Sequence, residues 1–146
     1  MNIRPMLIED YGQVYSLWIN TPNMGLNNLD DSKEGIAKYL ARNPKTCFVA
    51  EKDGCITGVI LSGHDGRRGY IHHAAVSGSE QRKGIGTALV NTAMAALKSE
   101  GINKVVAIVF EKNIKGNAFW ENYGFAERND LVYRDKLIVD LTRIDT

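Results

Sequence analysis

The sequence predicts one mixed α/β domain, a mostly antiparallel sheet with flanking helices and one parallel strand pair, and three observations predict it. The tight turn Asp53-Gly54 joins two apolar runs, as in a β-hairpin. A glycine-rich turn separates a strand-like stretch from a long amphipathic run. The apolar run Val105 to Phe110 is typical of a strand that is covered on both faces and parallel to its neighbour.

Length and composition are those of one globular domain spanning residues 1–146, with 44% apolar and 24% charged residues. A net charge of +1, from 18 basic and 17 acidic residues, gives no global field that would hold a nucleic acid or an anionic membrane. Any anion must therefore bind at a local site. No apolar run approaches the roughly 20 residues of a membrane helix, and the first ten residues lack the apolar core of a signal peptide. We expect a cytoplasmic protein with no membrane partner.

The first third of the chain predicts one strand and two helices. A short strand is expected over Ile3–Met6, and apolar residues at helical spacing follow across Ile8–Ile19. A second helix is expected over Ser32–Arg42, with Asp31 or Ser32 as its N-cap.

Three antiparallel strands are expected next, over Cys47–Glu51, Cys55–Leu61 and Tyr70–Val76. With Asp53-Gly54 as a two-residue loop, Cys55 pairs with Lys52, which places the two cysteines ~16 Å apart along the hairpin. That exceeds the ~7 Å limit on the Cα separation in a disulfide. Both cysteines are therefore expected to be free thiols, as suits a reducing cytosol, and neither has metal-ligand spacing. We expect no metal site.

The second half of the chain alternates helices and strands. The expected elements are a helix over Thr87–Ser99 that ends at Gly101, the strand Val105–Phe110, a helix over Lys115–Asn122 that ends at Gly124, and final strands at Leu131–Val132 and Lys136–Leu141.

The glycine-rich turn carries the clearest chemical signal. It follows the strand that ends at Val76, it precedes a helix, and it reads Gln81-Arg82-Lys83-Gly84-Ile85-Gly86-Thr87. The first turn of a helix has unpaired N–H groups and the positive end of the helix dipole. In the stretch from Gln81 to Thr87, the glycines leave those amides open, the two basic side chains add positive charge, and the threonine adds a hydrogen-bond donor. The turn predicts an anion site for a diphosphate-sized group.

Three phosphate-binding patterns use such a turn, and the residues separate them. A P-loop needs a lysine between Gly86 and Thr87, and a dinucleotide-binding turn needs a glycine at Leu89. The pattern Q/R-x-x-G-x-G/A fits Gln81, Gly84 and Gly86 without a mismatch. With it, the sequence resembles the GNAT superfamily of acyl-CoA-dependent N-acyltransferases.

The resemblance covers nearly the whole chain. Ile3-Arg4-Pro5 followed by Glu9-Asp10 looks like the family's first strand and helix, and Ala74-Ala75-Val76 looks like the strand end before its pyrophosphate loop. Asn113 and the stretch Phe119–Phe125 look like its later N…Y-x-x-x-G-F motif. The resemblance thus implies an acyltransferase with a GNAT-like fold, with acetyl-CoA as co-substrate and the parallel strand pair at the acyl-CoA site.

The same resemblance implies the cofactor-binding residues. The backbone of Ala75 and Val76 would hydrogen-bond the pantetheine arm, and Asn113 would contact the cofactor from the other side. The pyrophosphate would lie on the turn, whose residues are Gln81, Arg82, Lys83, Gly84, Ile85, Gly86 and Thr87. Two alternatives stay open: a plain surface loop for the turn, and a helix N-cap for Asn113, which does not exclude the cofactor contact.

Direct acyl transfer needs a polarised thioester carbonyl and a proton for the leaving thiolate. In the family a backbone N–H polarises the carbonyl, and here that would be Val76. The family's usual proton donor is the tyrosine of Y-x-x-x-G-F, but that position holds Trp120, whose indole is no acid. Tyr123, Tyr133 or bulk solvent would substitute, the alternative for Tyr123 being core packing, since the family usually has an apolar packing residue at that position.

The third requirement is a neutral amine. By the period of two, Tyr70, His72 and Ala74 share one strand face, and the intervening Ile71, His73 and Ala75 share the other. His72 lies four residues before Val76, where serotonin N-acetyltransferase-like members carry a histidine that acts through water. We expect His72 to assist amine deprotonation, the alternative being a strand histidine satisfied by its neighbours. His73 is expected to be structural.

The leading hypothesis is an N-acetyltransferase that acts on a primary amine of a small molecule, amino acid or peptide. The acceptor would enter between the Leu7–Arg42 region and the final strands, where Asp30 and Asp31 would attract an ammonium group. The alternative is an acyl-CoA-binding sensor or interaction module without turnover, which Trp120 supports. A nucleic acid is not an expected partner, because no extended basic surface exists. A homodimer is the family's common habit.

Overall fold

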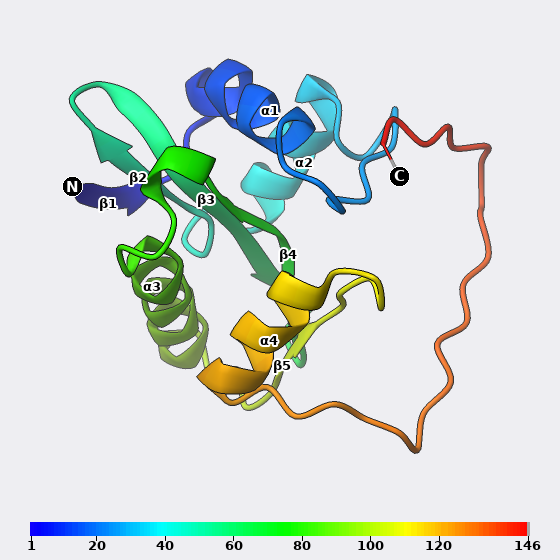
Figure 1. The fold of residues 1–146 in the computed structure, drawn as a ribbon. Helices are drawn as coiled ribbons and strands as arrows, with labels where there is room; N and C mark the ends of the chain where they lie inside the picture. Colours follow the sequence, from blue (N-terminus) through cyan, green and yellow to red (C-terminus); the bar gives the residue numbers. More distant parts are fainter. Residues whose placement is uncertain (146) are drawn as a thin grey trace.

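The computed structural model describes residues 1–145, which form one five-stranded sheet with helices on both faces (Figure 1). The strands are β1 (Asn2–Pro5), β2 (Phe48–Lys52), β3 (Cys55–His64), β4 (Gly69–Val76) and β5 (Val105–Ala107). The helices are α1 (Tyr11–Ile19), α2 (Lys33–Arg42), α3 (Ile85–Ser99) and α4 (Ile114–Tyr123), with 3-10 turns η1 (Ile8–Asp10) and η2 (Gly78–Glu80).

The sheet order is β1-β2-β3-β4-β5, and every neighbouring pair is antiparallel except β4 and β5, which are parallel. The predicted mixed α/β fold class, with its one parallel pair, is therefore confirmed. No helix within residues 1–145 is long and apolar enough to cross a membrane.

The hairpin forms as predicted. Lys52 pairs with Cys55 across the two-residue turn, in which Asp53 has φ +52° and Gly54 has φ +79°. Positive φ at both central residues matches the twist of the flanking strands, which is why Asp-Gly is favoured there. Both cysteines are free thiols, as predicted. Burial raises the pKa of Cys47 to about 12, which makes this thiol unreactive near neutral pH.

Each face of the sheet has its own apolar core. One face packs against α1 and α2, with Val14, Trp18 and Ile36 fully or nearly buried. The other packs against α3, where Leu89 and Ala93 are buried. α3 follows the end of β4 through the turn that contains η2, and it packs back across this face of the sheet (Figure 1).

A β-bulge interrupts β4. Val59 pairs with Ala75 and Leu61 pairs with His72, so a single residue of β3 faces two residues of β4. His73 takes up the extra length with φ +46°, in the left-handed region. The bulge reverses the alternation of side chains, because Ile71 belongs to the α3 core and Ala75 to the α1 and α2 core. The predicted sharing of one face by Ile71, His73 and Ala75 is therefore wrong.

The predicted final strands do not form. Leu131–Val132 and Lys136–Leu141 lie in an extended segment without strand pairing, and β5 ends at Ala107 rather than Phe110. In Figure 1 this segment, coloured orange to red, leaves α4 and curves away from the domain. It returns at Leu26–Asn28, where Asn28 N donates to the carbonyl of Thr142 (2.9 Å) and Ile144 N donates to that of Leu26 (3.0 Å).

Candidate functional site

The two halves of β4 have different neighbours. Gly69–Ile71, here called the paired half, is bonded to β3 on one side and to β5 on the other. His72–Val76, the open half, has no strand partner on the β5 side among residues 1–145, because the pairing with β5 stops at Ile71 and Ala107. Backbone groups of the open half that face away from β3 are therefore unpaired by the sheet, although side chains of Trp18 and Gln81 bond the carbonyls of His73 and Val76.

The chain runs from the open half into the N-terminus of α3. The side chain of Ser32 caps α2, with 3.0 Å between Ser32 Oγ and Gly35 N, and Asn113 Oδ1 caps α4 by accepting from Gly116 N at 2.9 Å. The N-cap of α3 is instead Gly84, at φ +83°, and no side chain caps this helix. Its first amides thus stay open to an outside acceptor.

The turn before α3 is positively charged and partly tied down. Gln81 Nε2 donates to the Val76 carbonyl at 3.1 Å, which fixes the turn against the end of β4. Lys83 forms an ion pair with Glu80 at 3.0 Å, and the side-chain hydrogen bond from this lysine lowers the pKa of Glu80. Arg82 is exposed and has φ +64°.

The remaining predicted turn residues have distinct places. Gly86 needs its small size, since a Cβ there would lie 3.3 Å from the Phe119 ring of α4. The Ile85 side chain is buried in the α3 core, which leaves only its backbone for a ligand. Thr87 is exposed on the first turn of α3. The structure therefore brings Val76 and residues 81–87 together, with Ala75 adjacent but its side chain buried on the α1 side.

His72 lies at the first position of the open half and lines a hollow of about 250 Å³. The hollow lies between α2 and the strands β3 and β4, and its lining is Tyr39, Arg42, Asn43, Gly63, His64, Asp65, Tyr70 and His72. The imidazole stacks on Tyr70 at 6.2 Å and meets Tyr39 edge-on at 5.9 Å. Desolvation by these neighbours, followed by the nearby His73, lowers the pKa of His72. Its ring is therefore neutral near neutral pH.

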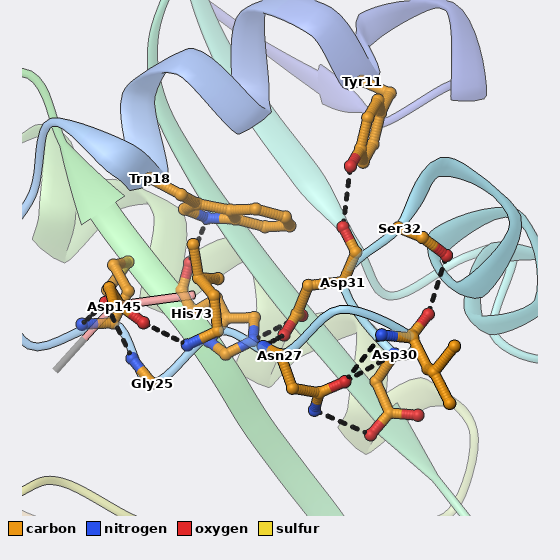
Figure 2. Close-up of polar contacts among 12 residues, drawn as sticks. Tyr11, Trp18, Gly25, Asn27, Asp30, Asp31, Ser32, His73 and Asp145 are labelled. Atoms are coloured by element: carbon orange, nitrogen blue, oxygen red, sulfur yellow. Dashed lines mark hydrogen bonds and ion pairs between the residues drawn. The ribbon is translucent and has the colours of Figure 1, made fainter. Parts of the chain in front are cut away.

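His73, the bulge residue, is held by a buried carboxylate (Figure 2). Its Nε2 lies 2.7 Å from Oδ1 of Asp31, which is 4% exposed and whose Oδ2 accepts from Asn27 N at 2.8 Å. The Trp18 indole donates to the His73 carbonyl at 3.1 Å. Asp31 is thus neither the helix cap nor an open attractor for an ammonium group, and Ser32 is the cap.

Both histidines lie on the α1 and α2 side of β4, with ring centroids 6.4 Å apart. Strand alternation would separate them, and the bulge brings them to the same side. The sequence carries no signal for this, because neither glycine nor asparagine marks the left-handed position.

Comparison with known proteins assigns the chain to a family. The model of the Acetyltransferase (GNAT) family matches residues 11–125, which include the open half of β4, the turn and α4. The chain belongs to the GNAT acetyltransferase family. An acetyltransferase of Yersinia pestis (strain Pestoides F) is 27% identical over 140 residues, covering 96% of this chain and 98% of that protein.

Two solved GNAT-like structures share the fold. The PaiA N-acetyltransferase of Thermoplasma acidophilum, solved with coenzyme A, superimposes with a TM-score of 0.75 at 20% identity, over 86% of this chain and 89% of that one. The aminoglycoside antibiotic 6'-N-acetyltransferase of Acinetobacter haemolyticus has a TM-score of 0.73 at 20% identity, over 95% of this chain and 100% of that one.

In this GNAT acetyltransferase the aromatic residues of α4 contact one another and Phe125. Trp120 lies edge-on to Phe119 and Phe125, with ring centroids 5.1 and 5.0 Å away. The Tyr123 hydroxyl donates to Asn91 Oδ1 on α3 at 2.5 Å. Tyr133 is 70% exposed in the extended segment, and the structure does not bring it to His72. Within residues 1–145, no three His, Cys, Asp or Glu side chains cluster as metal ligands would.

Proposed function

We propose that this GNAT acetyltransferase moves an acetyl group from acetyl-CoA directly to a primary amine of a small molecule, amino acid or peptide. The observation that carries the proposal is the uncapped N-terminus of α3, which lies directly after the open half of β4. Unpaired backbone along a strand followed by free helix amides suits an extended amide-bearing arm that ends in a diphosphate.

The proposed binding mode uses backbone groups more than side chains. The amide groups of the pantetheine arm would hydrogen-bond Ala75 and Val76, taking the side of β4 that β5 leaves unpaired. The pyrophosphate would accept from the amides that follow Gly84, where a Cβ would meet nothing within 4 Å. Arg82 and Lys83 would supply positive charge at the rim. Asn113, on the loop after β5, would contact the cofactor from the other side while its side chain caps α4.

In the proposed reaction, a backbone N–H of the open half polarises the thioester carbonyl, and the neutral amine attacks its carbon. The new C–N bond forms as the C–S bond breaks, and the nitrogen then releases its second proton to solvent. His72, neutral near pH 7, accepts a proton from the substrate ammonium through water. Solvent protonates the leaving thiolate, because Trp120 is no acid and the Tyr123 hydroxyl already donates to Asn91. A thiol of pKa ~8.5 leaves readily under these conditions.

The hollow beside His72 is the proposed acceptor site. Backbone N–H groups of Arg68 and Arg67 lower the pKa of Asp65, so the hollow keeps an ionised carboxylate on its wall. The Asp65 carboxylate would pair with an ammonium group of the acceptor, while Arg42 on the same wall leaves the hollow without net negative charge. One protein with the same fold is an aminoglycoside antibiotic 6'-N-acetyltransferase, which supports including aminoglycosides among the amines tested.

Release of free thiol tests the proposed reaction. Purified protein is incubated with acetyl-CoA and a panel of amines, amino acids, polyamines, aminoglycosides and peptides, and the release of free thiol is followed. We expect release with at least one class. Release with none would contradict the proposal.

Calorimetric titration with CoA tests the binding site separately. Arg82→Ala should weaken CoA binding about 5- to 30-fold, the range for one charge-assisted contact to phosphate. Arg67→Ala is the matched control, since Arg67 is an exposed arginine in the loop before β4 and should leave the affinity unchanged. Equal affinities for the two variants would contradict the assignment of the turn.

A further inference from the structure

The hollow beside His72 is lined by two side chains of opposite charge, Arg42 and Asp65. Arg42 lies in the last turn of α2, and Asp65 directly follows β3. Neither side chain takes part in an ion pair among residues 1–145, whereas His64 on the same wall is bonded to Glu100 at 3.0 Å. Opposite charges that share a hollow without neutralising each other suit a ligand that carries both signs.

The Asp65 carboxylate uses one oxygen for its own turn. Its Oδ1 accepts from the backbone amides of Arg67 and Arg68, each at 2.8 Å. The same bonds lower the pKa of Asp65, so the carboxylate is ionised near neutral pH. The turn leaves Oδ2 for the ammonium group that the proposed function assigns to this residue.

A hydrogen bond between α2 and β3 brings Arg42 to the same end of the hollow as Asp65. Asn43, the next residue after Arg42, is buried, and its Oδ1 accepts from His64 N at 3.0 Å. His64 directly precedes Asp65. Both charges therefore lie where the last turn of α2 meets the end of β3.

His72 lies toward the other end of the hollow. It pairs with Leu61, and Asp65 follows Leu61 by four residues, which is roughly 13 Å at ~3.3 Å per residue. A hydrogen bond at each end would take up about 3 Å, and a water molecule at His72 about 3 Å more. The two nitrogen atoms of an acceptor that fills this space would lie about 4 to 7 Å apart, the span of about three to five carbon atoms.

The middle of the hollow is aromatic. Tyr39 and Tyr70 contact the His72 ring there, and a Cβ on Gly63 would lie 2.5 Å from the Tyr39 hydroxyl oxygen. The Tyr39 side chain thus crosses β3 between the charged end and His72. Its ring suits a short methylene chain, and burial raises the pKa of Tyr39, so the hydroxyl stays protonated and can donate to a carboxylate.

We propose that the acceptor is a diamino acid, held at its α-carbon end by Arg42 and Asp65 and acetylated on its side-chain amine beside His72. The guanidinium pairs with the α-carboxylate, and Asp65 Oδ2 accepts from the α-ammonium. The side-chain amine gives one proton to His72 through water, forms its C–N bond as the C–S bond of acetyl-CoA breaks, and releases its second proton to solvent.

This inference rests on the proposed function and narrows its acceptor. A polyamine would leave Arg42 without a partner. An amino acid with a single amine, held by Arg42 and Asp65, would present no nitrogen to His72. A diamino acid meets all three groups at once.

Thiol release with matched acceptors tests the role of Arg42. L-ornithine and L-lysine are compared with putrescine and cadaverine, which lack only the carboxylate. We expect kcat/KM for at least one diamino acid to exceed that of its diamine by about 10-fold or more. Arg42→Gln should remove most of this preference by raising KM for the diamino acid while kcat changes little. Equal kcat/KM for diamine and diamino acid, or a preference that survives Arg42→Gln, would overturn the proposal.

Lys38→Gln is the matched control for Arg42→Gln. Lys38 is an exposed cation one turn earlier on α2 and does not line the hollow, so the preference should remain. Asp65→Asn retains Oδ1 for the turn and should remove the preference for the diamino acids over 5-aminopentanoate and 6-aminohexanoate, which lack only the α-ammonium. An undiminished preference in Asp65→Asn would also contradict the proposal.

Failure of this inference is distinguishable from failure of the proposed function. Thiol release with another amine but with neither diamino acid would overturn the inference alone, whereas release with no amine would contradict the proposed function. Calorimetric titration of the CoA complex with L-ornithine and L-lysine tests the inference without turnover. Binding that Arg42→Gln weakens about 10-fold and Lys38→Gln retains would support it, and absence of binding by both would overturn it.

Discussion

The paired half and the open half of β4 differ in what their backbone does, although they are parts of one strand. Gly69–Ile71 has strands on both sides, and its hydrogen bonds stabilise the sheet. His72–Val76 has β3 on one side only and leads into the uncapped end of α3. The sheet is thus paired on both sides along Gly69–Ile71 and on one side along His72–Val76, where we propose that acetyl-CoA binds.

The boundary between the halves is the bulge at His73. A histidine at φ +46° is strained, so contacts around it must hold this conformation. They are the 2.7 Å contact between His73 Nε2 and Oδ1 of the buried Asp31, and the hydrogen bond from Trp18 to the His73 carbonyl. Substitutions at Asp31, His72 and Gly69 would separately alter the bulge, the open half and the paired half of β4.

Asp31→Ala should have the largest effect. It leaves His73 and the Asn27 amide without their buried acceptor, and breaking such a pair costs about 3 kcal/mol. Urea denaturation should show that decrease in the free energy of unfolding. Asp30→Ala is the control, since the Asp30 side chain is exposed, and its change should stay within about 0.5 kcal/mol. Equal losses for the two variants would mean that the bulge is held by other contacts.

His72→Gln should come next, with kcat/KM lower by about 10- to 100-fold, a modest general-base contribution. Because burial and His73 lower the pKa of His72, the wild-type rate should rise with pH through a midpoint below 6.5, as the ring loses its proton. The variant should lose that rise. His64→Gln, on the wall of the same hollow, is the matched control and should retain it. An unchanged profile in His72→Gln would remove His72 from the mechanism.

Gly69→Ala should have the smallest effect, and only on stability. Its Cβ would lie 3.2 Å from Ile102 and Val105, a tight contact that costs about 1 kcal/mol. CoA affinity should not change, because the paired half faces no ligand. In contrast, Gly12→Ala meets nothing within 4 Å in α1 and should stabilise the protein by about 0.5 kcal/mol. Weaker CoA binding by Gly69→Ala would show that the two halves are not independent.

Local patterns predicted most of the fold. Asp53-Gly54 specified the hairpin and its register, and the apolar run at Val105 indicated the parallel strand. The glycine-rich turn predicted open amides at the start of the next helix; the structure begins that helix at Ile85 rather than at the expected Thr87, with Gly84 as its N-cap and no side-chain cap. Each of these features depends on residues that are neighbours in the chain, which is why the sequence was sufficient.

The features that the sequence missed depend on distant partners. The bulge at His73 is stabilised by Asp31, which lies 42 positions earlier in the chain. Because simple strand alternation takes no account of a bulge, it wrongly placed Ala75 on the same face of the sheet as Ile71. The apolar pattern of Lys136–Leu141 predicted a strand, but a strand needs a partner edge, and the structure shows none paired with it. Propensity alone does not specify where such partners lie.

We propose that acetyl-CoA lies along the open half of β4 and on the N-terminus of α3, and hydrogen exchange with and without acetyl-CoA would detect this placement. Bound acetyl-CoA should slow exchange for amides within Ala74–Val76 and Ile85–Thr87, and should cause no change for Gly69–Ile71, which the sheet already protects. Protection confined to the hollow between α3 and β5, lined by residues such as Met94 and Val105, or no protection at saturating acetyl-CoA, would contradict it.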